Sequence, residues 1–128
     1  DGSFTLPDDP RVRALGDLSP GLRQSLLAGA RGLINPSSLE SLSIVVLQAM
    51  RARVPVLVNA QSDVLRSYAG VSPSVLLFES DESLVAGIRQ LLDTDWAKKA
   101  DELDRAAQWV KDTYSWQRVL TVYERVAR

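Results

Sequence analysis

Residues 35–58 decide the fold, and they read NPSSLESLSIVVLQAMRARVPVLV. A polar loop with one acid, Glu40, leads into a helix that we expect from about Ser43 to Arg53. Apolar side chains lie almost all round that helix, and a helix of this kind lies buried between other elements. The strand that follows, residues 54–58, is continuously apolar, which is typical of a parallel sheet covered on both faces. The stretch therefore predicts a strand–loop–helix–strand unit, with the polar loop where the carboxyl end of a strand meets the start of a helix.

The junction between this loop and the helix is suited to an anion. The first N–H groups of a helix have no partner inside the helix, and the helix dipole places its positive end there. A phosphate group is a ligand that such a junction readily binds.

The rest of the chain alternates strands and helices. We expect strands over 11–16, 33–35, 54–58 and 75–78, a helix that starts at Ser19-Pro20, a helical turn over 63–68, and helices capped by Asp81, Thr94 and Ser115. This alternation predicts an α/β fold with a Rossmann-like parallel sheet of about four strands, flanked by helices and followed by a helical C-terminal cluster. The length of 128 residues suits one domain over 1–128.

Composition excludes several function classes. The net charge is −1, so the chain has no basic surplus for a nucleic-acid surface. No apolar run is long enough to cross a bilayer. The chain has no Cys and no His, which removes thiolate nucleophiles, a histidine base and the commonest metal ligands. Carboxylates, cations, hydroxyls and backbone dipoles remain, and they favour the positioning of an anion over acid–base catalysis.

Several segments, in the order in which they occur, carry a resemblance to a known family. Residues 36–50 follow the pattern P-S-x-x-E-x-[FLY]-[GS]-x-[VS]-x-[LV]-E-A-[MW], with Glu40 as its first acid and Gln48 in place of the second. Residues 8–16, 54–60 and 114–116 are similar to the family's V-x-F-L-G, P-V-L-V-N and Y-S-W segments. Together they resemble the C-terminal, donor-binding domain of the retaining GT-B glycosyltransferases of family 4 (group 1), from about Pro7 to the end of the chain.

The resemblance implies a hexosyltransferase of bacterial glycan biosynthesis that takes its sugar from a nucleotide diphosphate sugar. Glu40 matches the acid that binds hydroxyls of the donor sugar, and it is the candidate catalytic residue. Ser41, Leu42, Ser43 and Ile44 would bind the donor through backbone N–H groups. Gln48 stands where the family has a second acid at the nucleotide ribose. No cofactor and no metal are implied.

The chain also departs from the family pattern, and alternatives stay open. It starts after the β-α-β-α segment that brings an Arg and a Lys to the diphosphate, and the N-terminal acceptor domain is missing. Gln48 has lost the charge of the second acid and could simply bond the backbone, while Glu40 could be an ordinary first-turn acid. The alternative function is a catalytically inactive glycosyltransferase-like scaffold or interaction module. A related epimerase fits less well, because such enzymes use further acids and His.

These considerations give expectations for the whole molecule. We expect the isolated chain to be inactive, with a nucleotide sugar and the missing acceptor domain as its partners. We expect no nucleic acid partner and no membrane span, and self-association through an exposed sheet edge. The expected location is cytoplasmic, with peripheral attachment at the inner membrane face as the alternative.

Overall fold

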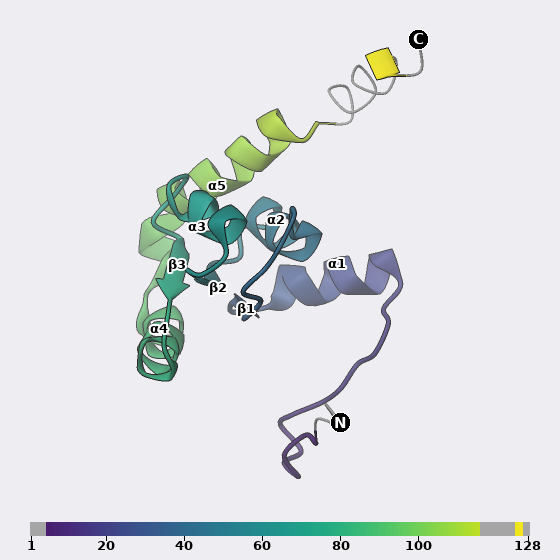
Figure 1. The fold of residues 1–128 in the computed structure, drawn as a ribbon, viewed down its shortest axis with the longest axis vertical. Helices are drawn as coiled ribbons and strands as arrows, with labels where there is room; N and C mark the ends of the chain where they lie inside the picture. Colours follow the sequence, from purple (N-terminus) through teal and green to yellow (C-terminus); the bar gives the residue numbers. More distant parts are fainter. Residues whose placement is uncertain (1–4, 116–124, 127–128) are drawn as a thin grey trace.

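The structure is a computed structural model, and it describes residues 5–115 and 125–126. The described elements are α1 (Pro20–Gly29), β1 (Leu33–Asn35), α2 (Ile44–Arg51), β2 (Val56–Asn59), α3 (Asp63–Ala69), β3 (Val75–Phe78), α4 (Asp81–Asp93), the 3-10 helix η1 (Trp96–Lys99) and α5 (Ala100–Thr113). The strands form one parallel sheet in the order β1-β2-β3 (Figure 1). The predicted α/β, Rossmann-like fold is confirmed, although the sheet in the described residues has three strands where about four were predicted.

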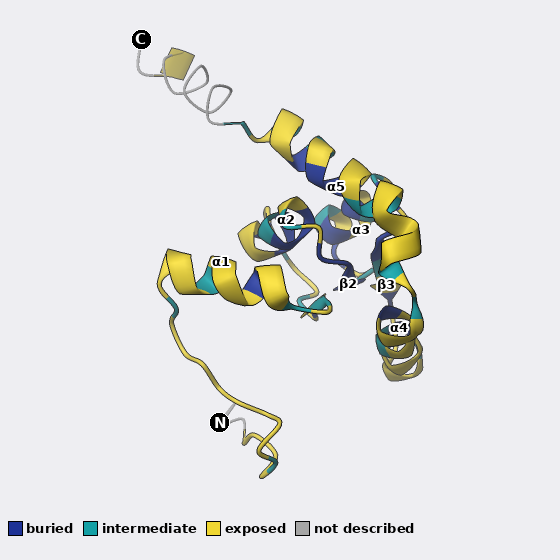
Figure 2. Ribbon diagram, turned by 180° about the vertical axis from the view of Figure 1, so that it is seen from behind, coloured by how far each residue is buried: buried dark blue, intermediate teal, exposed yellow. Residues whose placement is uncertain are grey.

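The central strand β2 separates two layers of helices. Val56 and Val58 pack with core residues of α2, α3 and α5, whereas Leu57 points to the other face and packs with Phe78 and Leu91 under α4. Figure 2 shows the buried residues of β2 between these layers. Its first three side chains, those of Val56, Leu57 and Val58, are 0% exposed, as the continuous apolar pattern predicts.

The strand predicted over 11–16 is wrong. Within the described residues, no strand of the sheet pairs with this segment, which runs away from the body of the molecule (Figures 1 and 2). Its backbone turns at the start, because the N–H of Val12 donates to the carbonyl of Asp9 at 2.9 Å and Arg11 bonds the Asp9 carboxylate. Val12 and Leu15 are 43% and 55% exposed, so the loose apolar alternation buries no face.

Two predicted helix starts lie next to the observed ones. Ser80, not Asp81, caps α4, and it does so in a capping box with Ser83. Thr94 ends α4 instead of starting a helix, and η1 separates it from α5. The helix predicted after Ser115 falls on residues 116–124, outside the described residues.

The α2 helix ends two residues before the predicted Arg53. The N–H of Val54 donates to the Ala49 carbonyl at 2.9 Å, and the N–H of Arg53 donates to the Met50 carbonyl at 3.1 Å. This hydrogen-bond pattern requires a left-handed residue, usually glycine, just after the helix. Here Arg53 takes that conformation with φ 63°, and its guanidinium pairs with Asp104 of α5 at 2.9 Å.

The strand β1 lies at one edge of the described sheet and pairs only with β2 there. Its central residue, Ile34, is 41% exposed. An open edge with an apolar side chain is consistent with self-association, which stays a prediction. None of the helices in the described part of the chain has the length and apolar character needed to cross a bilayer.

Gly87 should be required for the contact between α4 and β2. A Cβ at position 87 would lie 2.7 Å from Cδ1 of Leu57, whose side chain is fully buried. Overpacking costs about 1–3 kcal/mol, more than the gain in helix propensity of up to about 1 kcal/mol. We expect Gly87→Ala to lower the free energy of unfolding by about 1 kcal/mol or more, measured by urea denaturation.

Gly21 offers the matched control, because a Cβ there would meet nothing within 4 Å. Gly21→Ala in α1 should leave stability unchanged or raise it by up to about 1 kcal/mol. Equal effects of the two substitutions would contradict the packing argument.

Candidate functional site

The polar loop of residues 36–43 leaves the carboxyl end of β1 and enters α2, and Asn35 organises it. Asn35 is the last residue of β1 and is 8% exposed. Its Nδ2 donates to Ser43 Oγ at 2.8 Å and to Glu40 Oε1 at 3.1 Å, while its Oδ1 accepts from the N–H of Ser37 at 3.0 Å. The carboxylate of Glu40 is therefore held beside the start of α2.

Two other elements hold the same loop. Asn59, at the carboxyl end of β2, donates from Nδ2 to the carbonyl of Pro36 at 3.0 Å. The hydroxyl of Tyr68, from α3, donates to the carbonyl of Leu42. The loop is thus held at its start and near its end by side chains from the sheet and from a neighbouring helix.

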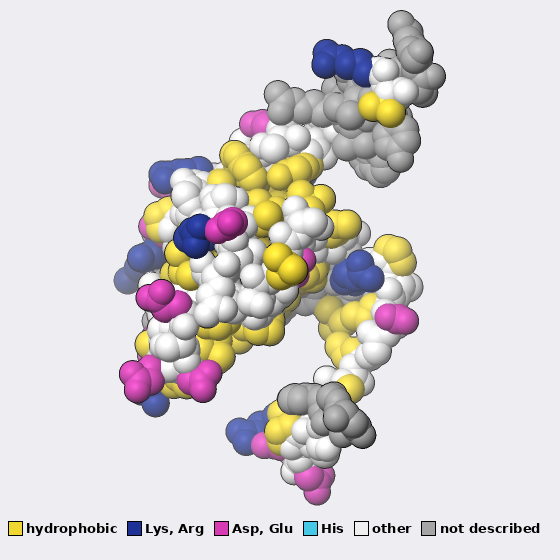
Figure 3. All heavy atoms as spheres, in the orientation of Figure 1, with side chains coloured by type: hydrophobic (Ala, Val, Ile, Leu, Met, Phe, Trp, Pro, Cys, Tyr) yellow, Lys and Arg dark blue, Asp and Glu magenta, His cyan; other side chains and the backbone are white. Residues whose placement is uncertain are grey.

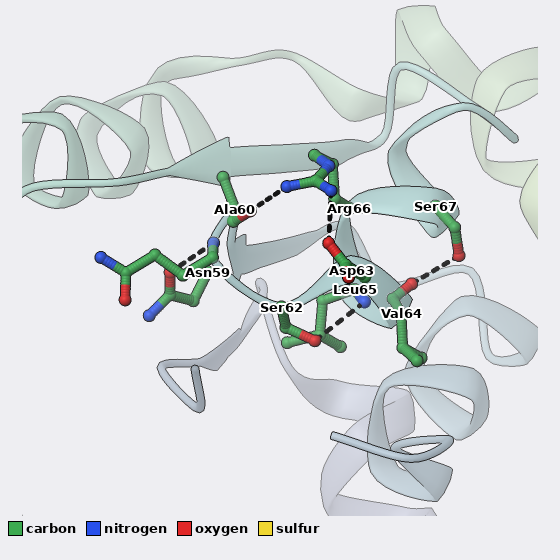
Figure 4. Close-up of polar contacts among 9 residues, drawn as sticks. Asn59, Ala60, Ser62, Asp63, Val64, Leu65, Arg66 and Ser67 are labelled. Atoms are coloured by element: carbon green, nitrogen blue, oxygen red, sulfur yellow. Dashed lines mark hydrogen bonds and ion pairs between the residues drawn. The ribbon is translucent and has the colours of Figure 1, made fainter. Parts of the chain in front are cut away.

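The turn after β2 is itself well ordered by hydrogen bonds (Figure 4). Oδ1 of Asn59 accepts from the N–H of Gln61 at 2.9 Å, and Ser62 caps α3 by accepting from the N–H of Leu65 at 3.2 Å. Arg66 donates to the Ala60 carbonyl at 2.9 Å and also pairs with Asp63. These hydrogen bonds within the turn fix the position of Asn59 against the loop.

The N-terminus of α2 has no side-chain cap. Ser43, its N-cap residue, has a left-handed backbone with φ 57° and ψ 75°, and its side chain makes no cap hydrogen bond. The hydroxyl that could cap the helix instead accepts from Asn35. The first N–H groups of α2 therefore keep their capacity to bind an anion.

A groove begins next to this loop. Its volume is about 760 Å³, and its wall consists of Gln24, Leu27, Leu42, Ile44, Leu47, Gln48, Arg51, Ala52, Val110 and Tyr114. Hydrophobic side chains gather over α2 and the end of α5 in the corresponding view (Figure 3). Among the described residues, Gln48 Oε1 is the buried side-chain polar atom that has no hydrogen-bond partner. This atom is buried, so it could accept from a ligand hydroxyl or amine in the groove only after the amide turned towards the groove.

The structure divides the predicted site residues into two groups. Leu42, Ile44 and Gln48 line the groove. Glu40 and Ser43 belong to the hydrogen-bond network of Asn35. Ser41, in the loop between them, is exposed.

Asn35, Asn59 and Tyr68 were not predicted as site residues. One sequence signal could have identified the two asparagines, because each ends a strand of the predicted sheet. The carboxyl ends of parallel strands meet at one edge, so polar side chains there lie close together. Tyr68 has no such signal, since its bond to Leu42 spans 26 residues.

Burial dominates the ionisation of Tyr68. Removal from water raises the pKa of its phenol to about 12, and the neighbouring Tyr114 and Glu40 add smaller contributions in the same direction. Tyr68 therefore stays protonated at neutral pH and keeps its bond to Leu42. Within the described part of the chain, no group of three or more acidic, His or Cys side chains is placed to hold a metal ion.

Comparison with known proteins gives one family. The family model described as "Glycosyl transferases group 1" matches residues 9–110, most of the 128-residue chain. Neither a curated protein nor a solved structure matches the chain significantly.

The raised pKa of Tyr68 predicts a loss of stability at alkaline pH. In the unfolded chain a tyrosine releases its proton near pH 10, whereas in the folded protein Tyr68 does so near pH 12. Its contribution to stability is therefore complete below about pH 10 and is lost as the pH rises towards 12. Urea denaturation at a series of pH values should show this fall in the free energy of unfolding, and Tyr68→Phe should make the fall smaller.

Tyr114→Phe is the control, because it keeps the Tyr68 phenol, and its free energy of unfolding should still fall as the pH rises. If the free energy of unfolding falls equally steeply with pH in the unsubstituted chain and in Tyr68→Phe, the assignment to Tyr68 is refuted.

Proposed function

The chain belongs to the glycosyl transferases of group 1, and from that premise we propose that it binds the nucleotide-sugar donor in the retaining transfer of a hexosyl group. One observation carries the proposal. A single carboxylate, Glu40, is held at the carboxyl end of a parallel strand, beside the uncapped start of α2. A sugar diphosphate needs both groups, because its hydroxyls donate hydrogen bonds and its phosphates accept them.

The diphosphate is proposed to lie against the start of α2. The backbone N–H groups of Ser41, Leu42, Ser43 and Ile44 would stabilise it together with the positive end of the helix dipole. Charge builds up on the diphosphate as the bond to the sugar breaks, so donors fixed in advance lower the barrier to transfer. This is catalysis by position and electrostatics, without a histidine or a thiolate.

Glu40 is proposed to orient the sugar. Its Oε1 already accepts from Asn35 at 3.1 Å, and Oε2 makes no hydrogen bond with the described residues. A carboxylate can accept several hydrogen bonds, and those to a charged group are the stronger ones. Glu40 can thus keep its bond to Asn35 and still receive a sugar hydroxyl.

The groove beside the loop is proposed to hold the nucleoside. Its wall includes Gln48, whose buried Oε1 has no partner, and the amide would turn towards the groove to accept from a ribose hydroxyl, as the acid at this position does in the family. The nearby Leu42 and Ile44 supply apolar surface for a ribose or a base.

The acceptor is proposed to bind a part of the protein outside residues 1–128. Transfer requires the acceptor and the donor to be held together, and the network around Glu40 concerns only one reactant. On this proposal the 128 residues are the donor side of a GT-B enzyme, need no metal, and act in the cytoplasm or at the inner membrane face.

The second candidate is a catalytically inactive module that keeps the fold for interaction with another protein. The observation in its favour is Gln48, because the amide replaces the charge of the family's second acid. Donor binding separates the two candidates, since an inactive scaffold need not bind any nucleotide sugar.

The loss of Glu40 should weaken donor binding. Glu40→Ala removes hydrogen bonds to a charged group, each worth about 1.5–3 kcal/mol, so the affinity should fall by about tenfold to a hundredfold. UDP-, GDP- and ADP-glucose can be titrated into the chain while amide chemical shifts are followed. Stability should fall by about 1 kcal/mol or less, because Asn35 keeps its bond to Ser43.

Glu79 provides the matched control. It is an exposed carboxylate directly after β3, the strand on the other side of β2 from β1. Glu79→Ala should leave donor binding unchanged. Equal losses in the two variants, or no binding by the unsubstituted chain, would count against the proposal.

The substitution Gln48→Glu tests the nucleoside position. With a ribose in the groove, the added charge should tighten nucleotide-sugar binding by about tenfold, because hydrogen bonds to a carboxylate are stronger. Without a ribose, a partly buried carboxylate with no partner should lower the thermal midpoint. Thermal unfolding with and without UDP-, GDP- or ADP-glucose distinguishes these results, and a lower midpoint with no response to any donor would exclude the ribose role.

A further inference from the structure

We propose that Asn35 is a positioning residue, which holds the Glu40 carboxylate in the orientation that receives the donor sugar. The inference rests on the proposed function of Glu40. It begins with the place of Asn35 in the sheet, where it pairs with Val58 of the fully buried strand β2. Its side chain leaves the rigid end of β1 and is 8% exposed.

The orientation of the Asn35 amide follows from its backbone neighbour. The N–H of Ser37 can only donate, so the atom that it contacts at 3.0 Å must be the carbonyl oxygen Oδ1. The amide nitrogen then faces the loop, where it reaches Glu40 at 3.1 Å and Ser43 at 2.8 Å. Both ends of the amide are in use, and turning the amide over would lose the bonds to Ser37 and Glu40, because each of these partners can act in only one direction.

This amide joins the two parts of the proposed donor site. One bond fixes the carboxylate for the sugar, and the other reaches Ser43, the left-handed residue at the start of α2. A left-handed backbone is unfavourable for a residue other than glycine, and it persists where its surroundings hold it. Asn35 therefore fixes the carboxylate of Glu40 relative to the first N–H groups of α2.

An aspartate at position 35 would change the chemistry but hardly the shape. It could still accept from Ser37, and the Ser43 hydroxyl could turn to donate to it. It has no proton for Glu40, however, so at high pH two carboxylates would face each other and would repel. At lower pH the pair can share a proton and restore a hydrogen bond.

The surroundings leave this pair as the group that would titrate between pH 5 and 8. From α3, Tyr68 lies near Glu40, whose charge contributes to the raised pKa of Tyr68, and that pKa of about 12 keeps the phenol protonated. From β2, Asn59 is neutral, and no described Lys or Arg forms an ion pair with Glu40. A pH dependence created by Asn35→Asp would therefore report the contact between positions 35 and 40.

The test compares the 128-residue chain with Asn35→Asp by amide chemical-shift titration at pH 5.5 and pH 8. The probes are UDP-, GDP- and ADP-glucose, and the matching nucleoside diphosphates without sugar. We expect Asn35→Asp to bind the best sugar nucleotide about tenfold more weakly at pH 8, and to recover most of that loss at pH 5.5. Binding of the diphosphate alone should change much less.

Asn59→Asp is the matched control, since it makes the same substitution at the end of the neighbouring strand but contacts Pro36 and Gln61 instead of Glu40. Its effect on binding should change with pH much less than that of Asn35→Asp, because position 59 faces a carbonyl and not a second carboxylate. If Asn35→Asp does not fold, Asn35→Ser replaces it and should lower the ratio of sugar-nucleotide to diphosphate affinity at both pH values.

The outcomes separate two failures. No binding of any probe by the unsubstituted chain would overturn the proposed function, and the role of Asn35 with it. In the other case, the unsubstituted chain binds the probes, and Asn35→Asp binds them with the same affinity, the same sugar preference and the same pH dependence. That result would overturn the role of Asn35 alone. An unchanged affinity ratio in Asn35→Ser would do the same.

Discussion

Burial of β2 on both faces is the constraint on which the rest of the structure depends. Full burial of a Val or Leu side chain contributes about 1.5–3 kcal/mol, and Val56, Leu57 and Val58 are all 0% exposed. Two helix layers are needed to achieve this, α4 on one side and α2, α3 and α5 on the other. Because β1 and β3 pair with β2 in parallel, the carboxyl ends of all described strands meet at one edge of the sheet.

The polar side chains that organise the candidate site lie at that edge of the sheet. Polar side chains are unfavourable along a strand that is buried on both faces, but the last residue of the strand can be polar. Asn35 and Asn59 occupy the carboxyl ends of β1 and β2, and both hold the loop of residues 36–43. A loop that is ordered before its ligand arrives loses less conformational entropy on binding. The hydrogen bonds of Asn35, Asn59 and Tyr68 thus act as preorganisation for whatever the loop binds.

Sequence reasoning predicts the elements that depend on local pattern. The buried helix and strand within residues 44–58 were predicted correctly, because their apolar runs have one solution in an α/β sheet. The strand over 11–16 was wrong, since a strand needs a partner as well as a pattern. Glu40 could be proposed from its loop and the family resemblance. Tyr68 could not, and the place of Asn35 at a strand end signals only the edge of the sheet, because its bonds to Glu40 and Ser43 depend on which atoms the fold brings within hydrogen-bond distance. The free oxygen of Gln48 likewise follows from packing in three dimensions.

The hydrogen bonds that shape the loop lie within one contiguous segment of the chain. They join residues separated by 5, 8, 23 and 26 positions, all between Asn35 and Tyr68. Closing such small loops of chain costs little entropy, and contiguous units of this size often open and close cooperatively in hydrogen exchange. The loop should therefore share the opening free energy of the segment from β1 to α3. During synthesis on the ribosome, every residue of this network is made before α4 and α5, so the geometry around Glu40 can begin to form on the nascent chain.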